Sequence, residues 1–218
     1  MQAPRAERLS LAGPAGGLQA LIETPVPEAD SAAPVSAFAV VCHPHPLFGG
    51  TMHNKVVFRA AAALNDAGLV TLRLNFRGVG QSTGEHDEGR GERDDVRAGL
   101  DYLAANYAHH EITLCGFSFG ARVGLEVGVA DERVARLISI GTPVDKYDFS
   151  FLAQCRKPIL FVQGDADEYG DVERLRELAA KINAPVQLSV IKGAGHFFDD
   201  QLNELKQTIT EWLVPESR

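Results

Sequence analysis

The sequence predicts an α/β domain with a doubly wound, mostly parallel central sheet of about seven to eight strands and helices on both faces. Short apolar runs, typical of buried strands, alternate with amphipathic segments of helical spacing along nearly the whole chain. The length of 218 residues is ordinary for one such unit, so we expect residues 1–218 to form a single domain.

The order of the expected elements follows from the same pattern. Residues 1–24 predict a β-hairpin at the sheet edge, because two β-like runs flank a glycine-rich turn, and a surface loop is expected at 25–34. Further strands are expected at 36–42, 69–76, 112–115, 134–140, 158–164 and 186–191, and helices at 54–67, from the charged stretch 85–95 onward, at 121–128, at 172–182 and near the carboxyl end. Only about 14 residues separate Pro143 from the strand at 158–164, so no helical cap is expected there.

Charge and composition exclude several classes of function. The net charge of −8 at pH 7 opposes capture of nucleic acid or of an anionic membrane surface. No apolar run is long enough for a signal peptide core or a membrane span, so a cytoplasmic protein is expected. The three cysteines are far apart in the sequence, and we interpret them as reduced thiols rather than as a disulfide or zinc site.

The most informative stretch is 112–128, in which an apolar strand leads into G-x-S-x-G and then into a helix of small residues. This context resembles the nucleophile elbow of the α/β-hydrolases, where a tight strand-to-helix turn exposes a serine hydroxyl above the sheet. Gly116 and Gly120 suit a turn whose backbone passes close to its neighbours. The resemblance implies that Ser118 is the nucleophile and that the Phe119 N–H is one oxyanion donor.

A second oxyanion donor is expected in the loop 43–51, which has the sequence H-P-H-P-L-F-G-G-T. In α/β-hydrolases the loop after the equivalent strand donates one backbone N–H, which proline lacks. We therefore expect Leu47 to be this donor, with His45 as the alternative. His43 and His45 have no nearby carboxylate or third ligand, so we interpret them as structural or pocket residues and expect no metal site.

Two later loops supply an acid and a base. His196 follows the last expected strand in the run G-A-G-H, and Asp167 completes a G-x-x-D pattern at the end of another strand. The order Ser118, Asp167, His196 is the order of nucleophile, acid and histidine in the α/β-hydrolases. Asp165 is the main rival for the role of the acid, and Glu168 is a weaker one.

The glycine-rich run 77–84 does not predict a nucleotide site. It lacks the lysine of a P-loop, and its third glycine is one place late for G-x-G-x-x-G. It resembles instead the R-G-x-G-x-S turn that is common in α/β-hydrolases. No cofactor is expected.

Together, several motifs resemble small capless bacterial serine hydrolases of the α/β-hydrolase superfamily, of the dienelactone hydrolase or esterase type. The motifs are the segments 43–50, 75–80, 116–120, 164–168 and 195–198, within a resemblance that spans about residues 18–213. It implies an enzyme that cleaves a small-molecule ester or thioester through an acyl-enzyme on Ser118. The expected pocket residues are His43, His45, Phe48, Phe117 and Phe197.

Two other functions are kept as alternatives. A non-catalytic ligand-binding or interaction protein could use the same scaffold, since a fold does not fix a function. A peptidase is a weaker alternative, because amides are harder to cleave and no extended peptide-binding domain is indicated. We expect a monomer or weak homodimer without nucleic-acid or membrane partners.

Overall fold

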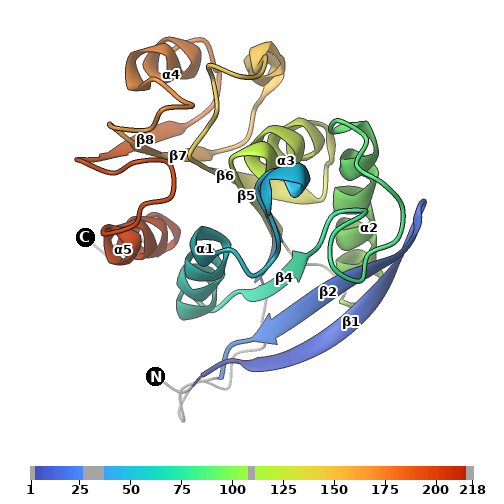
Figure 1. Cartoon of the computed structure of the whole chain (residues 1–218). Coiled ribbons are helices and arrows are strands. Elements are labelled where there is room, and N and C mark those ends of the chain that lie inside the picture. Colours follow the sequence, from blue (N-terminus) through green and yellow to red (C-terminus); the bar gives the residue numbers. More distant parts are fainter. Residues whose placement is uncertain (1–2, 27–36, 108–110, 215–218) are drawn as a thin grey trace.

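The computed structural model describes residues 3–26, 37–107 and 111–214, and these form an eight-stranded sheet with helices on both faces (Figure 1). The strand order is β1-β2-β4-β3-β5-β6-β7-β8. β1 (Arg5–Gly13) and β2 (Gly16–Thr24) form an antiparallel hairpin, and β2 pairs antiparallel with β4. Every other pair is parallel, which confirms the predicted edge hairpin and mostly parallel sheet.

The remaining elements alternate along the chain as the apolar pattern predicts. The strands are β3 (Ala37–Cys42), β4 (Val70–Leu74), β5 (Glu111–Phe117), β6 (Val134–Ile140), β7 (Ile159–Gly164) and β8 (Val186–Ile191). The helices are α1 (Lys55–Asp66), α2 (Arg90–Asn106), α3 (Phe119–Ala130), α4 (Val172–Ala179) and α5 (Leu202–Leu213), with short 3₁₀ turns η1 (Pro46–Phe48) and η2 (Ser150–Gln154). Residues 27–36, which include most of the predicted loop at 25–34, lie outside the described residues.

The helix predicted from the charged stretch 85–95 begins later than expected. α2 starts at Arg90, after Gly89 with a φ of 91°, so Glu85, Asp87 and Glu88 lie in the loop before it. The Glu92 carboxylate accepts hydrogen bonds from the N–H groups of Asp87 and Gly89 at 2.9 and 2.8 Å. Glu92 therefore holds this loop from inside the first turn of the helix.

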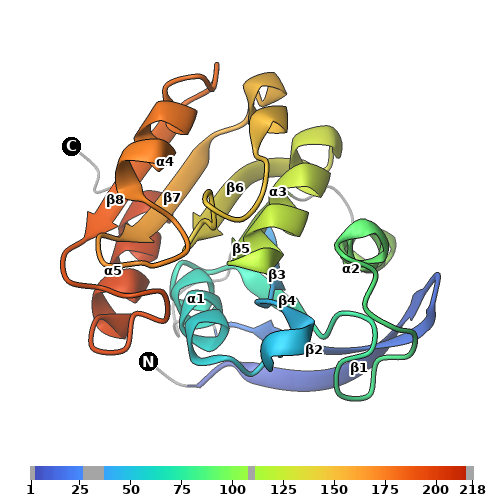
Figure 2. The ribbon, with the colours of Figure 1, turned by 45° about the horizontal axis from the view of Figure 1, so that its top comes forward.

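The sheet separates two layers of helices. Figures 1 and 2 show α1 and α5 on one face and α2, α3 and α4 on the other. Each layer encloses its own apolar cluster, because side chains of a strand covered on both sides point alternately to each face. Cys42 and Cys115 illustrate the alternation, since these buried thiols belong to opposite clusters.

Within residues 3–26, 37–107 and 111–214, no large helical insertion follows the carboxyl end of a parallel strand. The segment between β6 and β7 contains the short η2 turn and no longer helix. This agrees with the prediction that the chain has no cap at this position.

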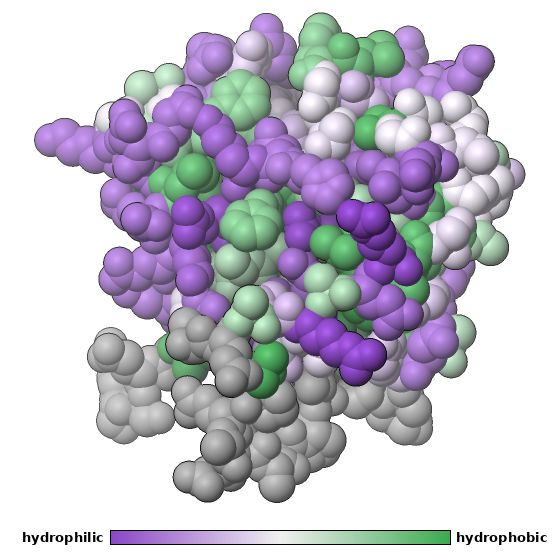
Figure 3. Space-filling view, turned by 60° about the horizontal axis from the view of Figure 1, so that its bottom comes forward, coloured by the Kyte–Doolittle hydropathy of each residue, from purple (hydrophilic) through white to green (hydrophobic). Residues whose placement is uncertain are grey.

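In the coloured part of the face shown in Figure 3, hydrophilic residues predominate and the apolar patches are small and separated. None of the helices in the described part of the chain is long and apolar enough to cross a membrane.

A buried ion pair joins the hairpin to the rest of the sheet. Arg73 on β4 donates from Nε to Glu23 on β2 at 2.9 Å, and both side chains are buried. Arg73 also donates from Nη1 to the Met52 carbonyl at 2.8 Å. The pair therefore anchors the segment that connects the 43–51 loop to α1.

We expect Arg73→Met to lower the free energy of unfolding by about 3 kcal/mol or more, because it leaves the Glu23 charge buried without a partner. Arg136→Met is the matched control: it breaks a pair with Glu111, which is exposed, and should cost less than about 1 kcal/mol. Urea unfolding of both variants measures the difference. Equal losses would contradict a special role for the buried pair.

Candidate active site

Ser118 lies at the turn between β5 and α3 in a strained backbone conformation. Its φ is 56° and its ψ is −120°, a region that residues other than glycine rarely occupy. The Ser118 N–H donates to the Ile140 carbonyl at 2.9 Å, which ties the turn to β6. The sharp strand-to-helix turn predicted for the G-x-S-x-G run is therefore present.

Two glycines make this turn possible. A Cβ atom on Gly116 would lie 2.3 Å from the Gly120 carbonyl oxygen, and one on Gly120 would lie 2.4 Å from the His43 carbonyl oxygen. A side chain at either position would therefore force backbone away from backbone. The second distance also means that the start of the 43–51 loop packs directly against the turn that carries Ser118.

His196 reaches Ser118 from the loop that follows β8. Its Nε2 atom lies 2.9 Å from Ser118 Oγ, within hydrogen-bond distance. The side chain is only 4% exposed, and its ring contacts those of Phe117, Tyr169 and Phe197 at centroid distances of 4.9, 4.7 and 5.2 Å. These contacts hold the imidazole in one orientation.

Asp167 binds the other side of the same imidazole. Its Oδ1 and Oδ2 atoms lie 3.0 and 2.9 Å from His196 Nδ1. The carboxylate also accepts hydrogen bonds from the Tyr169 N–H and from Gln163 Nε2, each at 2.8 Å. Because a carboxylate only accepts, Nδ1 carries the proton and the Nε2 lone pair faces the Ser118 hydroxyl.

The rivals of Asp167 lie elsewhere. Asp165 is exposed and accepts a hydrogen bond from the Gly193 N–H, so it stabilises the turn that leads to His196. Glu168 is also exposed, and no hydrogen bond of the described residues joins it to His196. The geometry thus separates two aspartates that the sequence pattern leaves as alternatives.

Gln163 is a site residue that the motifs miss. Its Oε1 atom accepts from the Thr142 N–H at 2.7 Å, and its Nε2 atom donates to Asp167 and to the Gly170 carbonyl, the latter at 2.9 Å. It therefore links the loop after β6 to the loop that carries the acid. The sequence feature that could have revealed Gln163 is its amide side chain in an otherwise apolar strand, because a buried polar group needs hydrogen-bond partners.

His43 does not line a pocket, contrary to expectation. It is fully buried, its Nε2 atom accepts from the Phe76 N–H at 3.0 Å, and its Nδ1 atom donates to the Pro44 carbonyl at 2.6 Å. Burial lowers the pKa of His43 to about 4, so the ring is neutral at pH 7. With both nitrogens occupied, His43 stabilises the loop and offers nothing to a substrate or a metal ion.

The Leu47 N–H, which is expected to be the second oxyanion donor, already has a partner within the same loop. The Leu47 N–H donates to His45 Nδ1 at 3.2 Å within the η1 turn, and is therefore occupied. Among the described residues, no hydrogen bond uses the N–H of His45 or that of Phe119. The rings of these two residues are in contact, with centroids 4.8 Å apart. The alternative donor, His45, therefore has a backbone N–H without a partner in the described residues, and its ring contacts that of Phe119.

Apolar side chains gather around this site. Phe48 is 85% exposed at the tip of η1, and Phe197 is 42% exposed next to His196. Phe117 is buried against the His196 ring. Of the three phenylalanines expected in the pocket, Phe48 and Phe197 are thus exposed, and Phe117 is a buried residue that packs against His196.

A surface cavity of about 360 Å³ lies between the β6–β7 connection and α4. Tyr147 and Phe149 line it, whereas Ser118, Asp167 and His196 do not. The Tyr147 ring nevertheless contacts the Phe119 ring, with centroids 6.3 Å apart, so the cavity begins one side chain away from the residue that follows Ser118.

Comparisons with known proteins agree with this geometry. Residues 40–212 match the family model described as an alpha/beta hydrolase domain. The uncharacterized protein RP471 of Rickettsia prowazekii (strain Madrid E) is 37% identical over 195 residues, which cover 85% of this chain and 82% of that protein. The chain therefore belongs to the alpha/beta hydrolase family.

Two solved structures are similar over almost the whole chain. An alpha-beta serine hydrolase homologue from Coxiella burnetii has a TM-score of 0.88 and 40% identity, covering 95% of this chain and 97% of that one. XC6422 from Xanthomonas campestris, described as a serine hydrolase without lid, has a TM-score of 0.86 and 36% identity, covering 98% and 97%. The sheet and its helices thus form the α/β-hydrolase fold.

We expect Gly120→Ala to lower the free energy of unfolding by about 2 kcal/mol, because the added methyl group meets two backbone carbonyls. Gly124→Ala is the matched control on the same helix, since a Cβ atom there comes no closer than 3.7 Å to a neighbour. It should be neutral or stabilise the protein by up to about 1 kcal/mol. Thermal and urea unfolding compare the two, and a Gly120→Ala protein as stable as Gly124→Ala would contradict the close contact.

Proposed function

We propose that the protein is a serine hydrolase that cleaves ester or thioester bonds of small or acyl substrates through Ser118, His196 and Asp167. The observation that carries this proposal is the continuous hydrogen-bonded chain from Ser118 Oγ through the imidazole to the Asp167 carboxylate. Serine is a weak nucleophile until a base takes its proton, and the base works best when a carboxylate orients it.

The proposed reaction has two halves. His196 Nε2 accepts the Ser118 proton as Oγ attacks the carbonyl carbon, and the imidazolium then protonates the leaving alcohol or thiol. Water, deprotonated by the same nitrogen, attacks the acyl-enzyme and releases the acid with a free serine. Asp167 stays ionised throughout and stabilises the imidazolium.

We infer that the backbone N–H groups of Phe119 and His45 stabilise the oxyanion. Both groups lack a hydrogen-bond partner in the described residues, and the two side chains are in ring contact beside the nucleophile. Phe119 is also the first residue of α3, where the N–H groups point out of the helix and the dipole favours negative charge. Preorganised donors of this kind are worth about 3 kcal/mol each in known hydrolases.

The choice of esters and thioesters follows from the open, apolar surroundings. No helical cap lies between β6 and β7, and the exposed aromatic side chains of Phe48 and Phe197 suit an apolar acyl or alcohol group. The description of the Coxiella and Xanthomonas proteins as serine hydrolases supports the same reaction class. A scaffold used only for binding would have no need of an oriented imidazole beside a strained serine.

We expect a fluorophosphonate to form a single adduct on Ser118 of the wild type and none on Ser118→Ala. The variant should also lose hydrolysis of 4-nitrophenyl esters by at least about 10⁴-fold, because no other group can form the acyl-enzyme. Intact-protein and peptide mass spectrometry locate the adduct, and circular dichroism checks the fold. A folded wild type that neither reacts nor turns over any ester would favour the ligand-binding alternative.

The two neighbouring aspartates should respond differently to the same substitution. Asp167→Asn is expected to lower kcat by about 10⁴-fold, because the amide no longer fixes the imidazole tautomer. Asp165→Asn serves as the control, since among the described residues its carboxylate binds only the Gly193 N–H, and should change kcat by less than about tenfold. Steady-state kinetics of both variants test the assignment, and the reverse ranking would move the acid role to Asp165.

A further inference from the structure

A second pair of histidines lies beside the candidate active site. The rings of His45 and His86 are in contact, with centroids 4.8 Å apart. Both also contact Phe119, the residue after the nucleophile, at 4.8 and 5.5 Å. His45 comes from the 43–51 loop and His86 from the loop before α2, so two separate segments converge here. The proposed reaction leaves both imidazole rings without a role.

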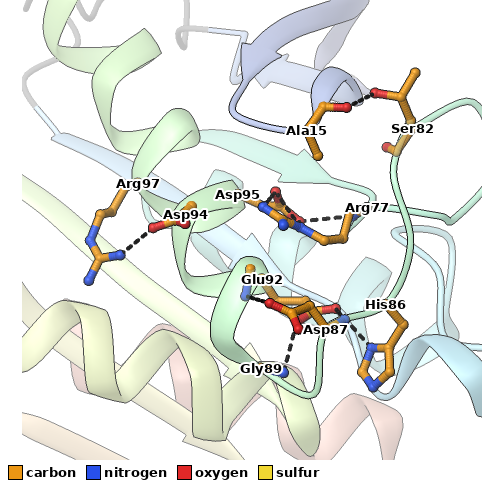
Figure 4. A network of polar contacts seen from close by, with 12 residues as sticks. Ala15, Arg77, Ser82, His86, Asp87, Gly89, Glu92, Asp94, Asp95 and Arg97 are labelled. Carbon is orange, nitrogen blue, oxygen red and sulfur yellow. Dashed lines mark hydrogen bonds and ion pairs between the residues drawn. The ribbon is translucent and has the colours of Figure 1, made fainter.

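His86 is held from behind by a buried carboxylate. Its Nδ1 atom lies 2.8 Å from Glu92 Oε1, and Glu92 is fully buried. Hydrogen bonds from the N–H groups of Asp87 and Gly89 fix the orientation of that carboxylate. Figure 4 shows these contacts and shows the second ring nitrogen of His86 turned away from Glu92. His86 Nδ1 forms no hydrogen bond of good geometry in the described residues, so the contact fixes which ring atom faces the carboxylate rather than a linear hydrogen bond.

The two rings offer complementary hydrogen-bonding groups. His45 Nδ1 accepts from the Leu47 N–H, so the proton of the neutral ring is on Nε2, which is a donor. Burial and the neighbouring His86 lower the pKa of His45, which keeps this ring neutral at pH 7. In His86 the carboxylate faces Nδ1 and favours the proton there, which leaves Nε2 as an acceptor. Neither Nε2 atom has a hydrogen bond within the described residues.

His45 and His86 lie on one side of Ser118, and this position determines which part of a substrate they would contact. His196 must protonate the leaving group, so that group passes His196 and the nearby rings of Phe197 and Tyr169. The acyl group stays on Ser118 and takes the other side. His45 and His86 contact Phe119, and no ring contact of the described residues joins either of them to His196, so in the proposed reaction they lie on the side of the acyl group.

We propose that His45 and His86 form a recognition site for a hydroxyl group on the acyl part of the substrate, which makes hydroxyacyl esters the preferred substrate class. This inference rests on the proposed function. One hydroxyl oxygen accepts a hydrogen bond from His45 Nε2 and donates its proton to His86 Nε2, which uses both free nitrogens.

Other acyl groups match the pair less well. An alkyl chain would leave two desolvated ring nitrogens without partners. An oxo group could accept from His45 but could not donate to His86. A carboxylate group on the acyl part of the substrate would face the lone pair of His86 and, behind that ring, the buried carboxylate of Glu92.

The test compares esters that differ by one hydroxyl group. The pairs are 4-nitrophenyl butanoate with each enantiomer of the 3-hydroxybutanoate, and 4-nitrophenyl phenylacetate with each enantiomer of the mandelate. The readout is kcat/KM for the hydroxylated ester divided by kcat/KM for the ester without the hydroxyl group. When this ratio is compared between variants, the intrinsic reactivity of the two esters cancels. His86→Phe keeps an aromatic ring against Phe119 and removes both nitrogens. We expect it to lower the ratio about tenfold for at least one pair.

Two further variants serve as a control and as a conservative replacement. His53→Phe is the matched control, because His53 is an exposed histidine for which the described residues show no ring contact to the site, and the ratio should not change. His86→Gln keeps an acceptor oxygen and should retain more of the ratio than His86→Phe. A ratio equal to that of the wild type in a folded, active His86→Phe protein would overturn the inference. Failure of the wild type to cleave any of the esters would instead count against the proposed function itself.

Discussion

The contact of backbone with backbone at the turn that carries Ser118 is the constraint on which the rest of the site depends. Gly120 lets the first turn of α3 touch the carbonyls at the end of β3, and Gly116 lets β5 pass beneath that turn. The same contact brings the 43–51 loop beside Phe119. Because parallel strands end at one edge of the sheet, β7 and β8 deliver their loops to the place that this turn defines.

Polar side chains near that turn fix the positions of His196 and Asp167. Asp167 orients His196, while Asp165 shapes the loop from which His196 projects. Gln163, near the end of β7, donates to Asp167 and also accepts from the loop after β6. Because each of these groups has at least one partner from another loop, the arrangement is stiff before any substrate arrives, and stiffness of this kind lowers the reorganisation that chemistry requires.

Most of the fold is predictable from the sequence because apolar periodicity reports burial, and burial determines the layers. The positions of Ser118 and His196 are predictable because each follows a strand in a glycine-containing motif. The hydrogen bonds of the loops are not, since they depend on ring orientations that spacing does not encode. His43 therefore proved structural rather than pocket-lining, and the available N–H was that of His45 rather than that of Leu47.

The short connection between β6 and β7 also has a kinetic consequence. Enzymes that close a lid over the acyl-enzyme exclude water and can hand the acyl group to another alcohol or amine. In this chain the η2 turn is the longest helical element of that connection, so in the proposed reaction no helix of the connection would shield an acyl group on Ser118 from water. In the proposed reaction, water would then be the most abundant acceptor, and a connection of this length would favour hydrolysis over acyl transfer.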